Sequence, residues 1–124
     1  MRLLLDTHLL LWSLAAPERL TARARRLIDE GTVLVSAASI WEISIKSALG
    51  RLEADPHAVL AAVEPAGFEL LSISAAHAAA VGDLPPLHRD PFDRLLLAQG
   101  RAESVPLVTS DAALAAYGPG VMLV

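Results

Sequence analysis

The sequence predicts an α/β fold with a parallel sheet of four to five strands. Short apolar segments alternate along the chain with longer segments of helix-forming residues, and this alternation is typical of α/β proteins. The short segments are apolar at successive positions, as expected of strands that are buried on both faces of a sheet. A length of 124 residues is that of a single domain, so we expect one domain over residues 1–124.

Five segments rich in leucine, valine and isoleucine are the predicted strands, at residues 2–5, 33–35, 69–73, 107–109 and 121–123. Segments with apolar residues at helical spacing predict helices at residues 9–15, 22–30, 37–49, 57–64, 75–81, 92–103 and 112–117. Pro17, Gly31, Gly50 and Pro106 separate these segments, because glycine and proline stop helices. With right-handed crossovers, the carboxyl ends of parallel strands share one edge of the sheet, and ligands bind there.

The composition excludes several classes of protein. Cysteine is absent, which rules out thiol nucleophiles, disulfide scaffolds, iron–sulfur clusters and zinc fingers. No apolar run reaches the roughly 18 to 20 residues that a membrane-spanning helix needs. Asp6 interrupts the apolar start of the chain before the core of a secretory signal can form. We therefore expect a cytoplasmic protein with no membrane segment.

The charge and hydropathy of the chain bear on its partners. A net charge of −4 argues against a protein that holds nucleic acid by bulk charge alone. The basic residues are nine arginines and Lys46, and arginine suits phosphate oxygens, so an enzyme acting on nucleic acid stays open. The mean hydropathy of +0.48 is high for a small chain. Some apolar surface is therefore expected to face a partner, either a second copy or a dedicated binding protein.

Four carboxylates follow strands or open helices. Asp6 follows the first strand, Asp111 follows the fourth, Glu42 lies in the first turns of the helix after the second strand, and Asp93 opens a later helix. If the first and fourth strands are neighbours, these side chains meet at one edge of the sheet. Two carboxylates about 5 Å apart repel by about 3 kcal/mol at an effective dielectric constant of about 20. A cation is then needed, and oxygen ligands favour Mg²⁺ or Mn²⁺. Metal-assisted phosphodiester hydrolysis is the chemistry that suits this set.

Helix capping is the alternative explanation for the same acids, because Asp and Glu are favoured at helix N-termini. Ser39 and Glu42 have the spacing of a capping box. Asp90 followed by Pro91 fits an N-cap with proline at the first helical position. Taken one at a time, the acids are explained by capping as well as by a metal site.

Four segments resemble the signature blocks of PIN-domain proteins. They read LDTH at residues 5–8, SAASIWEI at 36–43, HRDPFDRLLLAQ at 88–99 and VTSD at 108–111. Their order and spacing match along the whole chain. The sequence is most similar to the VapC-type ribonuclease toxins of bacterial toxin–antitoxin modules, and the HRDPFDR string is the most specific of these signals.

The resemblance implies a three-layer α/β/α sandwich around the parallel sheet. It implies an endoribonuclease that depends on Mg²⁺ or Mn²⁺, forms a homodimer and is restrained by a small cognate antitoxin inserting into or over the acidic cleft. The family's catalytic and metal-ligating acids fall on Asp6, Glu42, Asp93 and Asp111. Asp90 is an additional acid of the HRDPFDR string, interpreted mainly as the N-cap of the next helix, with a direct metal role as the alternative.

Other residues near these blocks have two interpretations each. Thr7 and Thr109 match small hydroxyl positions beside the site, where they hold a carboxylate or a metal-bound water, or are ordinary strand-end hydroxyls. Lys46 lies four residues after Glu42 and either pairs with it or contacts substrate phosphate. Two arginines flank Asp93 and either receive the RNA backbone or form surface ion pairs: Arg89 and Arg94.

The histidines form no metal-binding motif. His8, which follows the first strand closely, is a candidate for contact with the site. Trp12 and Trp41 are expected to anchor the core or an interface rather than to stack on bases. We expect the remaining three histidines to be structural or solvated: His57, His77 and His88.

Two other functions stay open at this point. A receiver-like phosphoacceptor domain has a similar length and an acidic pocket, but residues 72–74 carry no aspartate to accept phosphate and no lysine follows the fifth strand. A catalytically silent PIN-shaped module that binds RNA or protein would keep the same acids. Incubation with RNA, with and without metal, separates this second alternative from the nuclease.

Overall fold

Five parallel strands form one sheet in the computed structural model, which describes residues 1–124. The order across the sheet is β3-β2-β1-β4-β5, so β1 is the central strand. The strands are β1 (Arg2–Leu5), β2 (Thr32–Ser36), β3 (Glu69–Leu71), β4 (Leu107–Thr109) and β5 (Val121–Leu123). The chain adds β2 and β3 on one side of β1 and then crosses over to add β4 and β5 on the other. The topological switch point therefore lies between β1 and β4.

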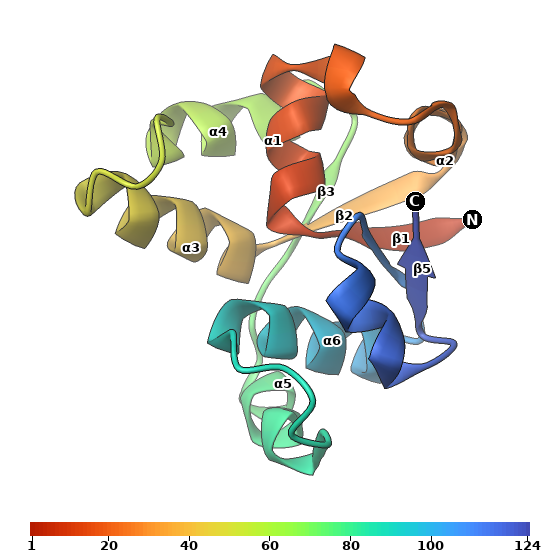
Figure 1. The fold of residues 1–124 in the computed structure, drawn as a ribbon. Coiled ribbons are helices and arrows are strands. Elements are labelled where there is room, and N and C mark those ends of the chain that lie inside the picture. Colours follow the sequence, from red (N-terminus) through yellow and green to blue (C-terminus); the bar gives the residue numbers. More distant parts are fainter.

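Helices cover both faces of this sheet (Figure 1). In that view α1, α2 and α4 lie above the sheet, and α5 and α6 lie below it. The α-helices are α1 (Thr7–Ala15), α2 (Ala22–Glu30), α3 (Ala37–Ala48), α4 (Pro56–Val63), α5 (Ala75–Ala80) and α6 (Pro91–Glu103). Three short 3-10 helices are η1 (Pro17–Arg19), η2 (Val81–Asp83) and η3 (Ala112–Tyr117). The predicted three-layer α/β/α sandwich is thereby confirmed.

Alternate residues of the strands serve two separate cores. Leu3 and Leu5 of β1 pack with Leu9 of α1 in one core, and Leu4 packs with Leu96 of α6 in the other. All of these side chains are buried. The central positions of the strands are apolar on both faces of the sheet because helices cover both faces, which is the pattern expected of a parallel sheet. None of the helices has the length and apolar character needed to cross a bilayer.

Several boundaries differ from those predicted. α1 begins at Thr7, not at residue 9, because the Oδ1 atom of Asp6 accepts a hydrogen bond from the Leu9 N–H at 2.8 Å and caps the helix. β3 ends at Leu71, two residues earlier than expected. Residues 112–117 form a 3-10 helix that ends at Gly118, which has a φ of 96°, and such short segments commonly adopt this tighter helix.

The predicted capping box at Ser39 and Glu42 is wrong. α3 begins at Ala37, and Ser36 is its N-cap, so Ser39 lies inside the helix. The Ser36 Oγ atom accepts from the Ala38 N–H at 2.9 Å. A capping box forms at α5 instead, where a histidine at the third helical position takes the place of the usual Glu or Gln.

A buried glutamine fixes α6 against the carboxyl ends of two strands. The Gln99 side chain is fully buried, and its Oε1 atom accepts a hydrogen bond from Ser36 Oγ at the end of β2. Its Nε2 atom donates to the Ser72 carbonyl at 3.3 Å, just beyond β3. Because α3 starts directly after Ser36, this contact also sets where α3 begins relative to α6.

Gly31 connects α2 to β2 at a position where a side chain does not fit. A Cβ atom there would lie 2.6 Å from the Leu27 carbonyl oxygen and 2.9 Å from that of Met1, and both are backbone atoms. We expect Gly31→Ala to destabilise the protein by about 1–3 kcal/mol, measured by urea unfolding. Gly82→Ala is the control, because a Cβ atom there has no neighbour within 4 Å. An equal loss in both variants would contradict this account of Gly31.

Candidate active site

Four acidic side chains lie at the carboxyl edge of the sheet, around the switch point. Asp6 follows β1 directly, and Asp111 comes two residues after the end of β4. Glu42 lies in the second turn of α3, and Asp93 lies in the first turn of α6. The negative charges of Asp6 and Glu42 both act on Asp93. The structure therefore brings together the acids that the sequence singled out.

Asp6 links the ends of the two central strands. Its Oδ1 atom caps α1, while its Oδ2 atom accepts a hydrogen bond from the Thr109 hydroxyl at the end of β4. The Thr109 hydroxyl in turn accepts the Asp111 N–H at 3.0 Å. Asp6 is only 4% exposed, and burial raises its pKa although the hydrogen bonds from Thr109 and Leu9 oppose this shift.

Glu42 is buried and has a partner for each of its two oxygens. The Thr7 hydroxyl lies 2.6 Å from Oε1 and 3.0 Å from the Ser39 hydroxyl. Because a hydroxyl has one proton, Thr7 donates it to the carboxylate. Oε2 pairs with the ammonium group of Lys46. The hydrogen bond to Glu42 raises the pKa of Lys46, and the charges of Asp90 and Asp93 add to this effect.

Asp93 and Asp111 face a common neighbour that sequence reasoning did not select. His88 Nε2 lies 3.7 Å from Asp93 Oδ2 and 3.6 Å from Asp111 Oδ2. One ligand atom from each of the three residues lies within 4.8 Å of the others. The sequence did hold one signal for this role of His88, which is its position in the HRDPFDR string just before the N-cap of α6. A turn there folds His88 back onto the first turn of the helix.

Asp93 is the most perturbed acid of the group. Burial and the charges of Asp90, Glu42 and Asp6 raise the pKa of Asp93 to about 7, although His88 opposes the shift. Burial is the largest cause of this shift, and the neighbouring carboxylates add negative charge that disfavours ionisation of Asp93 further. A divalent cation would supply the missing positive charge, and carboxylates from α3, α6 and the two strand ends offer the oxygen ligands that Mg²⁺ and Mn²⁺ prefer.

Asp90 and the two nearby arginines have distinct places. Asp90 is the N-cap of α6, as predicted, and its Oδ1 atom accepts from the Asp93 N–H at 3.0 Å. Arg94 donates to the carbonyls of Val81 at 3.1 Å and Pro85 at 3.0 Å. Its guanidinium therefore bonds the connection between α5 and α6. Arg89 is exposed, and neither arginine forms the surface ion pair that was one of the two interpretations.

A small hollow beside Glu42 carries basic groups. It has a volume of about 280 Å³, and Thr7, His8, Glu42, Lys46 and Arg51 are among its lining residues. His8 thus borders the site. Arg51 was not selected from the sequence, because it lies beyond the end of α3 and outside every recognisable motif. Lys46 and Arg51 place positive charge in this hollow next to the carboxylates, where it would attract a phosphate backbone.

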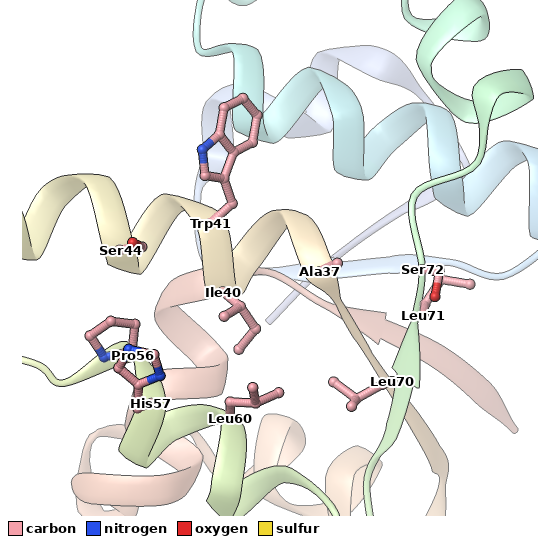
Figure 2. A pocket seen from close by; sticks show the side chains of 10 residues that line it. All are labelled: Ala37, Ile40, Trp41, Ser44, Pro56, His57, Leu60, Leu70, Leu71 and Ser72. Carbon is pink, nitrogen blue, oxygen red and sulfur yellow. The ribbon is translucent and has the colours of Figure 1, made fainter.

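A larger hollow lies away from the acids, between α3, α4 and β3 (Figure 2). It has a volume of about 460 Å³, and no carboxylate lines it. Ile40, Leu60 and Leu70 face one another across it, while the Trp41 ring points toward α6. Trp41 is 55% exposed and packs against the edge of Phe92 with ring centroids 5.0 Å apart. This apolar groove offers no carboxylate to a metal ion.

Comparison with solved structures shows the same fold in several toxin–antitoxin systems. VapBC2 from Rickettsia felis, bound to a promoter DNA fragment, matches with a TM-score of 0.71 and 18% identity over 99% of this chain and 97% of that one. A toxin–antitoxin complex from Klebsiella pneumoniae matches with a TM-score of 0.67 and 18% identity over 97% and 95%. FitAcB from Neisseria gonorrhoeae matches with a TM-score of 0.65 and 18% identity over 99% and 96%.

Comparison with curated proteins found no match. The family model described as the PIN domain matches residues 3–118, which include all four acids at the carboxyl edge of the sheet. The match spans nearly the whole chain, and the five-stranded parallel sheet agrees with it. This chain belongs to the PIN domain family.

Proposed function

We propose that this protein is a metal-dependent endoribonuclease that hydrolyses RNA phosphodiester bonds and acts as the toxin of a VapC-type toxin–antitoxin pair. The observation that carries the proposal is the gathering of Asp6, Glu42, Asp93 and Asp111 at one edge of the sheet. Membership of the PIN domain family and the likeness to VapBC2 and FitAcB support it.

The residues present fit a divalent cation. Asp93 and Asp111 present oxygens toward a common point, and Asp6 and Glu42 lie beside them as further ligands. When bound, Mg²⁺ or Mn²⁺ polarises a phosphoryl oxygen and lowers the pKa of a water molecule, which supplies a nucleophile near neutral pH. The mutual repulsion of the acids falls at the same time, so the raised pKa of Asp93 returns toward its ordinary value.

The chain's own side chains prepare this site in three ways. Thr109 and Thr7 hold the carboxylates of Asp6 and Glu42 in fixed orientations. Lys46 pairs with Glu42 and places a positive charge beside its carboxylate. Lys46 and Arg51 also line the hollow beside the acids, where they would receive the phosphates of RNA, and the exposed Arg89 is a further candidate for that contact.

The proposed partners are a small cognate antitoxin and a second copy of this chain. Two apolar hollows are left open, the one in Figure 2 and another between α1 and α4. Exposed apolar surface of this kind favours protein partners. The matching Klebsiella pneumoniae structure is itself a toxin–antitoxin complex. Sedimentation of the purified chain, alone and with the product of an adjacent small gene, tests both partners.

RNA cleavage in the presence of metal is the central test. We expect purified protein to cleave total RNA with Mg²⁺ or Mn²⁺ and to lose this activity in EDTA. Asp6→Asn should lower the rate by about 100-fold or more, because loss of a ligand exceeds the 10- to 100-fold effect of a typical residue around a metal site. Asp29→Asn is the control, since Asp29 is an exposed acid on α2. RNA binding without cleavage would favour the catalytically silent module instead.

The stability of the metal-free protein should depend on pH through Asp93. The pKa of Asp93 is about 7 in the folded chain against an ordinary value of 3.8. Between these two pH values the folded state holds a proton that the unfolded state releases. The free energy of unfolding therefore falls as pH rises through this window. In EDTA, we expect wild type to lose about 2 kcal/mol between pH 5 and pH 8 relative to Asp93→Asn, which carries no titrating carboxyl.

Chemical unfolding at several pH values measures this difference. Asp29→Asn should follow wild type across the range. Added Mg²⁺ should raise the stability of wild type most at pH 8, where Asp93 is ionised. If the free energies of unfolding of wild type and Asp93→Asn changed with pH in parallel, the pKa of Asp93 would not be raised in the folded protein.

A further inference from the structure

His88 is held in a single tautomer by the backbone. The Asp90 N–H lies 3.0 Å from His88 Nδ1, and a peptide N–H can only donate. Nδ1 must therefore present its lone pair, so a neutral imidazole carries its proton on Nε2. The His88 N–H is anchored too, because it donates to the Tyr117 hydroxyl at 2.9 Å. Both the ring and the main chain of His88 are thus fixed.

The Nε2–H group of this fixed ring lies between two carboxylates from different parts of the fold. Asp93 belongs to α6, whereas Asp111 follows β4 and caps η3 through its Oδ1 atom. The Asp111 side chain is 48% exposed, and its remaining oxygen, Oδ2, lies 3.6 Å from His88 Nε2. Without His88, nothing among the side chains would hold this oxygen toward Asp93.

We propose that His88 is a positioning residue of the acidic site, a donor whose Nε2–H draws the carboxylates of Asp93 and Asp111 toward one point. This inference rests on the proposed function and extends it. The distances of 3.7 and 3.6 Å exceed those of a direct hydrogen bond. The attraction is therefore between the N–H dipole and two charges, and it biases both side chains without occupying either oxygen.

Direct metal ligation by His88 is the competing role, and the tautomer opposes it. A ligating Nε2 needs its lone pair, which would move the proton to Nδ1. Nδ1–H would then face the Asp90 N–H, donor against donor, at 3.0 Å. The ligand set accordingly stays all-oxygen, which favours Mg²⁺ or Mn²⁺ over metals such as Zn²⁺ that prefer imidazole.

Binding of Mn²⁺ to the purified protein tests this role. We expect His88→Ala to weaken Mn²⁺ binding by about 10- to 100-fold, as residues that orient metal ligands typically do. His88→Gln, whose side-chain amide retains an N–H donor, should recover much of the loss. His57→Ala is the matched control, because His57 is exposed on α4 and lines the apolar groove. Unfolding curves in EDTA verify that each variant is folded.

Pulsed electron paramagnetic resonance of the bound Mn²⁺ separates the two roles. Wild type should show no coupling from a directly bonded imidazole nitrogen, and such coupling would overturn the positioning role. Unchanged Mn²⁺ affinity in folded His88→Ala would overturn it as well, while leaving metal-dependent RNA cleavage by wild type intact. A wild-type protein that neither binds Mn²⁺ nor cleaves RNA would instead overturn the proposed function, and the role of His88 with it.

Discussion

Repulsion among carboxylates at one edge of the sheet is the constraint on which the rest of this site depends. The parallel topology places the ends of β1 and β4 side by side, and each end continues into an acid. Folding therefore brings negative charges together that the unfolded chain keeps apart. The protein offsets part of this cost with Lys46, with the hydroxyls of Thr7 and Thr109 and with helix N-termini. Burial and the charges of Asp90, Glu42 and Asp6 still raise the pKa of Asp93.

The same aspartate side chain can cap a helix and belong to the acidic site. Asp6 caps α1 with Oδ1 and meets Thr109 with Oδ2, and Asp111 caps η3 with Oδ1 and faces His88 with Oδ2. A carboxylate has two oxygens, so one can satisfy a helix N-terminus while the other serves the site. The capping hydrogen bond also fixes the rotamer of the aspartate side chain. A local feature of the helix N-terminus therefore helps to place the second carboxylate oxygen in the acidic site.

Most of the strands, and the gathering of the acids at one edge of the sheet, could be predicted from the sequence, because they depend on local patterns and on one rule of topology. Apolar runs mark the strands, and parallel order puts Asp6 beside Asp111. His88 and Arg94 could not be placed in this way. Their surroundings come from segments distant in sequence: His88 meets Asp111, and Arg94 meets the carbonyls of the α5–α6 connection. The start of α3 at residue 37 was predicted, but its cap was assigned to Ser39, whereas Ser36 is the N-cap and its hydroxyl also bonds the buried Gln99.

The charge distribution also constrains how a nucleic acid would reach this edge. A chain with a net charge of −4 does not attract RNA through its overall charge, so attraction to RNA must be local. The positive groups near the acids are Lys46 and Arg51 in the hollow beside Glu42. In the metal-free protein the carboxylates oppose them and repel phosphate. A divalent cation would neutralise most of the local negative charge, so on the proposed function metal and RNA each favour the binding of the other, as thermodynamic linkage requires.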